Sequence, residues 1–154
     1  MNLALDESQQ LLVDTFAEFF ARECPSSLVR ETESSGFSSE LWVQLAELGA
    51  SGMGLPEAAG GVGAGMLELG LLSTECGRAL APVPFAEVAS ASRVLADQRG
   101  DESLLRAIVA GTERVSIAPH ASATDALERI LVPAGHAKGR SNSPGVPENP
   151  LVQE

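Results

Sequence analysis

The first segment of the chain shows a clear helical pattern of apolar and polar positions. Its apolar residues fall three or four positions apart and so share one helical face; they are Leu12, Phe16, Phe19 and Phe20. Asp6 with Gln9 three positions later is a capping box, in which each side chain accepts a hydrogen bond from the backbone N–H of the other residue. Pro25 disfavours helical geometry at Cys24. The pattern therefore predicts a helix between Asp6 and Cys24 that depends on what its apolar face packs against.

The same criteria predict five further helices before residue 112. They cover approximately residues 26–33, 38–49, 66–81, 84–99 and 101–110. Ser38 and Asp101 are N-cap residues, whereas Gly49 and Gly111 allow the left-handed backbone that stops a helix. The fourth helix has apolar residues on more than one face, which predicts burial on several sides. Between the third and fourth helices, seven glycines within residues 49–65 predict irregular backbone.

The pattern changes after Gly111. Residues 114–118 alternate polar and apolar side chains, which predicts one short strand. Residues 125–132 fit a helix or a strand equally well, and residues 133–154 contain four prolines and almost no apolar periodicity, as disordered tails do. We therefore predict an all-α fold, an up-and-down bundle of about six helices, over residues 1–112. A β-strand remnant over 113–132 and a disordered tail over 133–154 would follow.

Composition supports a folded, acidic domain. The chain has 154 residues, 44% of them apolar, with a mean hydropathy of +0.09 and a formal net charge of −11. Nucleic-acid binding requires a basic face, and this chain has a single lysine, Lys138. No apolar run reaches membrane-spanning length, and the first residues lack the basic start of a signal peptide. These features predict a soluble cytoplasmic protein that binds neither nucleic acid nor membranes.

Motifs that carry chemistry are not found. The glycine-rich segment has the spacing of neither a dinucleotide-binding nor a phosphate-binding loop. His120 and His136 lack partners at metal-ligand spacing, so no metal residue is predicted. Cys24 and Cys76 lack a C-x-x-C spacing and are expected to be two reduced thiols. The residues alone therefore predict no catalytic residue.

Four stretches in the same order resemble the N-terminal helical domain of acyl-CoA dehydrogenases, over residues 3–118. They are the opening LDESQQLL (5–12), LWVQLAELG (41–49), the loop GLPEAAGGVG (54–63) and ECGRALAPVPF (75–85). The resemblance implies a flavoprotein oxidoreductase of fatty acid metabolism, which uses FAD to desaturate acyl-CoA thioesters. Family members continue through a β-domain into a C-terminal helical domain, and the resemblance ends near residue 118.

The same resemblance limits which site residues can be expected. The family's catalytic Glu belongs to its C-terminal domain, and most flavin contacts come from regions without a counterpart here. We therefore assign no catalytic and no cofactor-binding residue, and we expect that this chain alone does not bind FAD. In the family, the start of the helix after Pro84 borders the acyl pocket, which makes Phe85 and Val88 candidates for the pocket lining. The alternative for both is a plain role in the core.

Three functional hypotheses follow from the resemblance. The chain could be an acyl-CoA dehydrogenase reduced to its N-terminal domain and inactive alone. It could instead be a non-catalytic subunit or binding module that pairs with a full-length dehydrogenase, or a truncated product without function. The partners implied are an acyl-CoA substrate and either a full-length dehydrogenase subunit or further copies of this chain.

Overall fold

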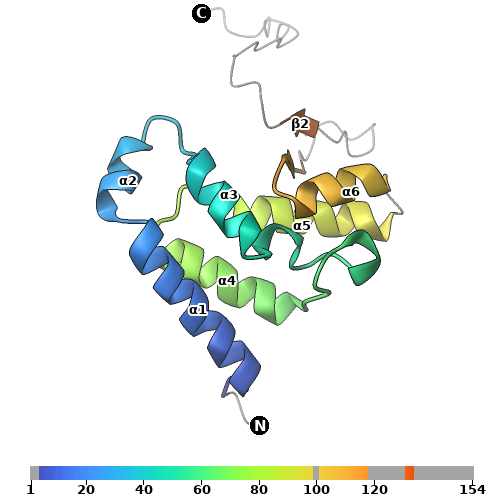
Figure 1. Cartoon of the computed structure of the whole chain (residues 1–154), viewed down its shortest axis with the longest axis horizontal. Helices are drawn as coiled ribbons and strands as arrows, with labels where there is room; N and C mark the ends of the chain where they lie inside the picture. The colour runs from blue at the N-terminus through green and yellow to red at the C-terminus, as the bar shows by residue number, and fades with distance from the viewer. Residues whose placement is uncertain (1–3, 99–100, 118–130, 134–154) are drawn as a thin grey trace, which may run out of the picture.

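The computed structural model describes residues 4–98, 101–117 and 131–133. Within these residues there are six α-helices and two short strands (Figure 1). The helices are α1 (Glu7–Glu23), α2 (Ser26–Glu31), α3 (Ser39–Glu47), α4 (Met66–Arg78), α5 (Phe85–Asp97) and α6 (Glu102–Val109). Two 3₁₀ turns, η1 (Ala50–Gly52) and η2 (Glu57–Ala59), lie between α3 and α4. The predicted all-α bundle of six helices is confirmed.

The helices begin at the predicted caps. Asp6 accepts a hydrogen bond from the backbone N–H of Gln9 at 2.8 Å, and the Gln9 side chain accepts one from the backbone N–H of Asp6 at 3.1 Å. Ser38 and Asp101 cap α3 and α6 with side-chain acceptors of their own. Each cap satisfies a backbone N–H that the first helical turn leaves without an intrahelical partner.

One helix ends earlier than the pattern predicted. The apolar run suggested that α4 continues to about residue 81, but the helix stops at Arg78. The physical reason is Leu80, which has a φ of +51° and is the one non-glycine residue with positive φ in the described chain. The backbone N–H of Ala81 then donates to the carbonyl oxygen of Cys76 at 2.9 Å, which closes the helix end.

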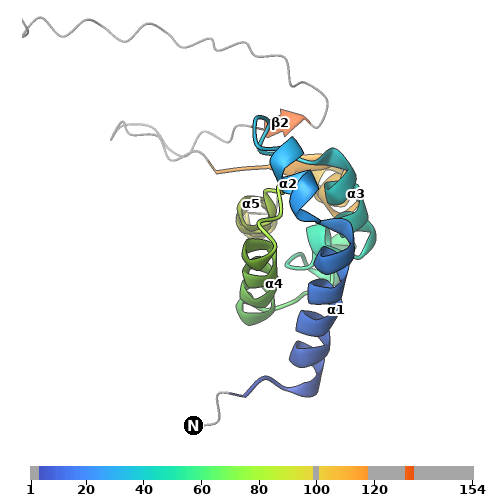
Figure 2. The same cartoon turned by 90° about the vertical axis from the view of Figure 1, so that its left-hand side faces the viewer.

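The helices pack around one core. α1 lies along α4, α4 contacts α5, and α5 contacts α6 (Figures 1 and 2). Fully buried side chains from four helices and a loop fill the interior; the largest are Trp42, Phe85, Leu41, Leu45, Leu55, Leu72 and Ile108. Trp42 also donates its indole N–H to the carbonyl oxygen of Gly111 at 2.9 Å, which joins α3 to the end of α6.

The glycine-rich segment is irregular, as predicted, and one of its glycines permits a close backbone approach. A Cβ atom at Gly61 would lie 2.6 Å from the carbonyl oxygen of Gly52 and still closer to that of Leu55. Those carbonyls accept backbone hydrogen bonds from Val62 and Gly63. The segment therefore folds back on itself as a tight structural loop between η1 and α4.

The two strands pair with each other. β1 (Glu113–Val115) and β2 (Leu131–Pro133) are antiparallel, with Arg114 opposite Val132. β1 overlaps the predicted strand over 114–118, and β2 shows that the end of the undecided segment 125–132 is extended. The predicted tail beyond residue 133 lies outside the described residues, and the predicted domain boundaries stay predictions. Among the described residues, no helix is both long enough and apolar enough to cross a membrane.

Candidate functional site

A groove between α4 and α5 exposes apolar side chains beside the predicted pocket residues. It consists of two adjoining hollows of about 350 and 360 Å³ that share Ser73 and Ala86. Met66 and Leu80 stand at its two ends and are 69% and 70% exposed. Exposed apolar surface of this kind is typical of contact with a partner or a ligand.

Small residues give the groove its depth. An added Cβ at Gly70 or Gly77 of α4 would meet no heavy atom within 4 Å, so both glycines face open space. Glycine costs about 1 kcal/mol relative to alanine in a helix interior. These two glycines are therefore not explained by packing within the described residues.

Three of the polar side chains that line the groove donate to backbone carbonyls. Ser73 Oγ donates to the carbonyl oxygen of Leu69 at 2.8 Å, and Ser90 Oγ donates to that of Ala86 at 2.7 Å. Arg93 donates to the carbonyl oxygen of Ala64 at 3.1 Å and so ties α5 to the end of the glycine-rich loop. The groove therefore presents mainly apolar surface.

The two predicted pocket residues lie on the buried side of α5. Phe85 and Val88 are both 2% exposed, and Phe85 lines the hollow at the Leu80 end of the groove together with Cys76 and Val83. Val88 is among the largest fully buried side chains. The structure thus places both residues in the core, and the acyl-pocket role of Phe85 and Val88 stays a prediction.

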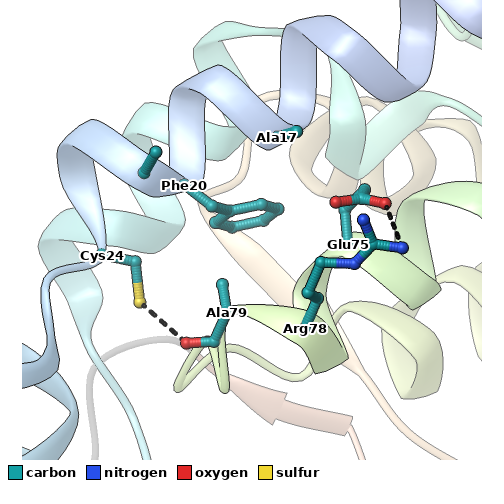
Figure 3. Close-up of a pocket in the computed structure, with 7 residues that line it drawn as sticks. Ala17, Phe20, Cys24, Glu75, Arg78 and Ala79 are labelled. Carbon is teal, nitrogen blue, oxygen red and sulfur yellow. Dashed lines mark hydrogen bonds and ion pairs between the residues drawn. The ribbon is translucent and has the colours of Figure 1, made fainter.

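A third hollow, of about 230 Å³, is lined by residues of α1 and of the end of α4 (Figure 3). Ala17, Phe20 and Ala21 line it from α1, and Glu75 lines it from α4. The Glu75 carboxylate is almost completely buried, and its neighbour Arg78 approaches it to 3.5 Å. Sequence analysis did not single out this hollow. The signal available in the sequence is Glu75 itself, because an acidic residue three positions after Leu72 lies on the same buried face of α4.

Both cysteines are buried free thiols near these hollows. Cys24 Sγ donates to the carbonyl oxygen of Ala79 at 3.7 Å, and burial raises the pKa of the Cys24 thiol. Burial raises the pKa of the Cys76 thiol to about 12. A thiolate is the reactive form of cysteine, so neither side chain is suited to nucleophilic chemistry in the folded chain.

The described residues do not form a metal site, and the charges that line the groove do not favour a flavin cofactor there. Within them, no three His, Cys, Asp or Glu side chains gather closely enough to hold a metal ion; His120 and His136 lie outside the described part. The groove is lined by one cation, Arg93, and by the anions Glu87 and Asp97. That balance repels the diphosphate of FAD, which requires cationic groups or backbone N–H donors.

A comparison with known protein families identifies the family to which this helical fold belongs. Residues 6–109 match the family described as acyl-CoA dehydrogenase, N-terminal domain. The chain belongs to the acyl-CoA dehydrogenase family. The helices, their N-caps and the glycine-rich loop all lie within the matched range, so membership in this family explains the fold of the described helical region.

Individual relatives extend the comparison. The chain is 31% identical over 110 residues to acyl-CoA dehydrogenase IpdE2 of Mycobacterium tuberculosis, across 69% of this chain and 35% of the relative. It is 31% identical over 134 residues to benzylmalonyl-CoA dehydrogenase of Aromatoleum aromaticum, across 87% of this chain and 30% of the relative.

A solved structure shows the same fold. The chain superimposes on a variant of the Tcur3481-Tcur3483 steroid ACAD with a TM-score of 0.64 and 32% sequence identity, across 71% of this chain and 32% of that one. This chain therefore spans about a third of the length of the relatives that it matches.

Proposed function

We propose that this chain forms the N-terminal helical part of an acyl-CoA dehydrogenase and does not desaturate acyl-CoA on its own. In this role α5 forms one side of the acyl-CoA site, and the α4–α5 groove packs against other parts of the enzyme. FAD, when bound, supplies the acceptor for the hydride removed from the substrate. The described residues contribute shape and apolar surface to such a site.

The observation that carries the proposal is the exposed apolar groove between α4 and α5. Met66 and Leu80 are mostly exposed, and Gly70 and Gly77 face open space. Burying apolar surface stabilises by roughly 25 cal/mol per Å², so a covered groove would be favoured over one left in water. About two thirds of each relative's length lies outside the part that this chain matches. This supports a further part of the enzyme as the surface that covers the groove.

The balance of charge supports the second part of the proposal, inactivity alone. The groove's one cation and two anions disfavour the FAD diphosphate, so the hydride acceptor would have to be held by other parts of the enzyme. Phe85 and Val88 then have a dual role, as core residues of this helical unit and as the apolar boundary behind the acyl group.

The substrate proposed for the assembled enzyme is an acyl-CoA with a ring in its acyl group. Two relatives support this choice by name, the benzylmalonyl-CoA dehydrogenase and the steroid ACAD. The test compares ring-bearing and straight-chain acyl-CoA thioesters as substrates of the assembled enzyme. Equal kcat/KM for the two classes would contradict a ring-bearing substrate.

The proposal is tested by purifying the chain alone and together with a full-length family member from the same source. We expect no flavin absorbance and no acyl-CoA oxidation with the lone chain, but a cooperative unfolding transition. Co-purification with flavin would favour the subunit hypothesis. Bound FAD with activity in the lone chain would contradict the proposal, and aggregation without cooperative unfolding would favour the non-functional product.

A further inference from the structure

Glu75 is the one charged residue that is buried in the described part of the chain. Its exposed fraction is 3%, and the other buried polar residues are three serines. An ionised carboxylate can accept about four hydrogen bonds. The contact that Glu75 makes is with Arg78 Nη2 at 3.5 Å, one turn later in α4, and that arginine side chain is 70% exposed. This single ion pair leaves most of the acceptor capacity of the carboxylate unused. Among the described residues no fully buried side-chain oxygen lacks a partner, so the carboxylate still reaches water at the hollow beside it.

The hollow beside Glu75 has the shape and chemistry to admit a second cationic partner for the carboxylate. Ala17, Ala21 and Ala79 are small and leave its space of about 230 Å³ open. Figure 3 shows the Glu75 carboxylate next to the guanidinium of Arg78, with the ring of Phe20 to the left of this pair. A carboxylate binds a guanidinium through two parallel hydrogen bonds, and an aromatic ring attracts a cation.

The surrounding charge also favours a cation. α1 contains four acidic residues and one arginine, and α4 contains two acidic residues and one arginine. The two helices that border the hollow are therefore net negative, and the field of such a surface attracts basic groups and repels acidic ones.

We propose that this hollow binds an arginine side chain presented by the surface of a partner protein. The guanidinium would donate to the Glu75 carboxylate and lie beside Phe20, which lines the hollow although its exposed fraction is only 2%. Arg78 would turn toward solvent, because its 3.5 Å contact is longer than the 2.7–2.9 Å typical of charge-assisted hydrogen bonds. Arginine fits better than lysine because its guanidinium is planar, weakly hydrated and able to pair at two points.

Backbone NMR of the whole chain tests this proposal with N-acetyl-argininamide as the probe. We expect saturable shifts of the amide signals of Ala17, Phe20 and Ala79. N-acetyl-citrullinamide is the matched control, because its side chain has nearly the same shape without the charge. We expect Glu75→Gln to weaken binding by about tenfold or more. Glu18→Gln removes an exposed charge from the same helix pair and should leave binding unchanged.

A second variant avoids any dependence on Glu75. Arg78 is exposed, so Arg78→Gln should fold normally; we expect it to bind the probe several-fold more tightly, because the competing guanidinium is gone. We also expect Glu75→Gln to leave the urea midpoint of the free chain unchanged or raised. Absence of saturable shifts in both the original chain and Arg78→Gln would overturn the proposal. An equal response to citrullinamide would do the same, as would matching losses of stability in Glu75→Gln and Arg78→Gln.

Discussion

Replacing Gly61 with alanine tests the tight loop between η1 and α4. The added Cβ would stand 2.6 Å from the carbonyl oxygen of Gly52 and closer still to that of Leu55, whereas ordinary contacts begin at 3.4 Å. Both neighbours are backbone atoms, so no side-chain rotation can relieve the clash. The loop has to move, and the hydrogen bonds from Val62 to Gly52 and from Gly63 to Leu55 then lengthen or break.

The cost follows from these two effects. Overpacking a close-packed site costs about 1–3 kcal/mol, and the loss of one of the two hydrogen bonds costs about 1 kcal/mol more. We therefore expect Gly61→Ala to lower the free energy of unfolding by about 2–4 kcal/mol. For a folded unit of roughly 100 residues this lowers Tm by about 8–16 °C. Circular dichroism during heating and during urea titration measures both quantities.

Gly70→Ala is the matched control, since it makes the same chemical change in the same chain. Gly70 lies inside α4, and its added Cβ meets no heavy atom within 4 Å. Alanine should therefore raise the stability of the lone chain by about 0.5–1 kcal/mol, because it restricts the unfolded chain and favours the helix. The reasoning would be refuted if the Tm of Gly61→Ala were within a degree or two of that of the original chain. It would also be refuted if Gly70→Ala lost as much stability as Gly61→Ala.

Three further predictions concern single side chains. Trp42→Phe removes the donor to the buried carbonyl oxygen of Gly111 and should lower unfolding free energy by about 1–3 kcal/mol in urea titration; no change would mean that another donor replaces it. Cys76, whose pKa burial raises to about 12, should react with iodoacetamide far more slowly in the folded chain than in urea, as mass spectrometry would show. Hydrogen bonds from the Ser8 hydroxyl and the backbone N–H of Gln9 lower the pKa of Asp6. The stabilisation from the ionised Asp6 carboxylate is therefore present above the pKa of the unfolded chain and is lost as pH falls through the pKa of the folded chain. Asp6→Asn keeps the cap, so the free energy of unfolding of this variant should fall less steeply with decreasing pH below about pH 4. An identical dependence on acid pH in the variant and the original chain would contradict this.

Local features of the fold could be predicted well from the sequence. Helix caps at Asp6, Ser38 and Asp101 depend on residues within three positions of one another, and all three form. Gly49 and Gly111 have the left-handed φ that their places after helices predicted. Such signals are readable because the interacting groups are neighbours in the chain.

The candidate sites were only partly predictable. Phe85 and Val88 were selected through the family resemblance, and the structure places both in the core. The hollow at Glu75 was not predicted, because its walls come from α1 and the end of α4, more than 50 positions apart. A pattern along one helix shows which side chains share a face, but it does not show which face remains uncovered.

The sequence by itself determined the number and type of the helices, their caps and the family resemblance, since periodicity and capping are local properties. Tertiary structure decided which apolar faces stay exposed, where the Gly61 backbone meets two carbonyls, and that a buried carboxylate borders an open hollow. These features depend on the packing of segments distant in sequence. Leu80 shows the same limit at one residue, because its left-handed backbone ends α4 where the apolar pattern alone continues.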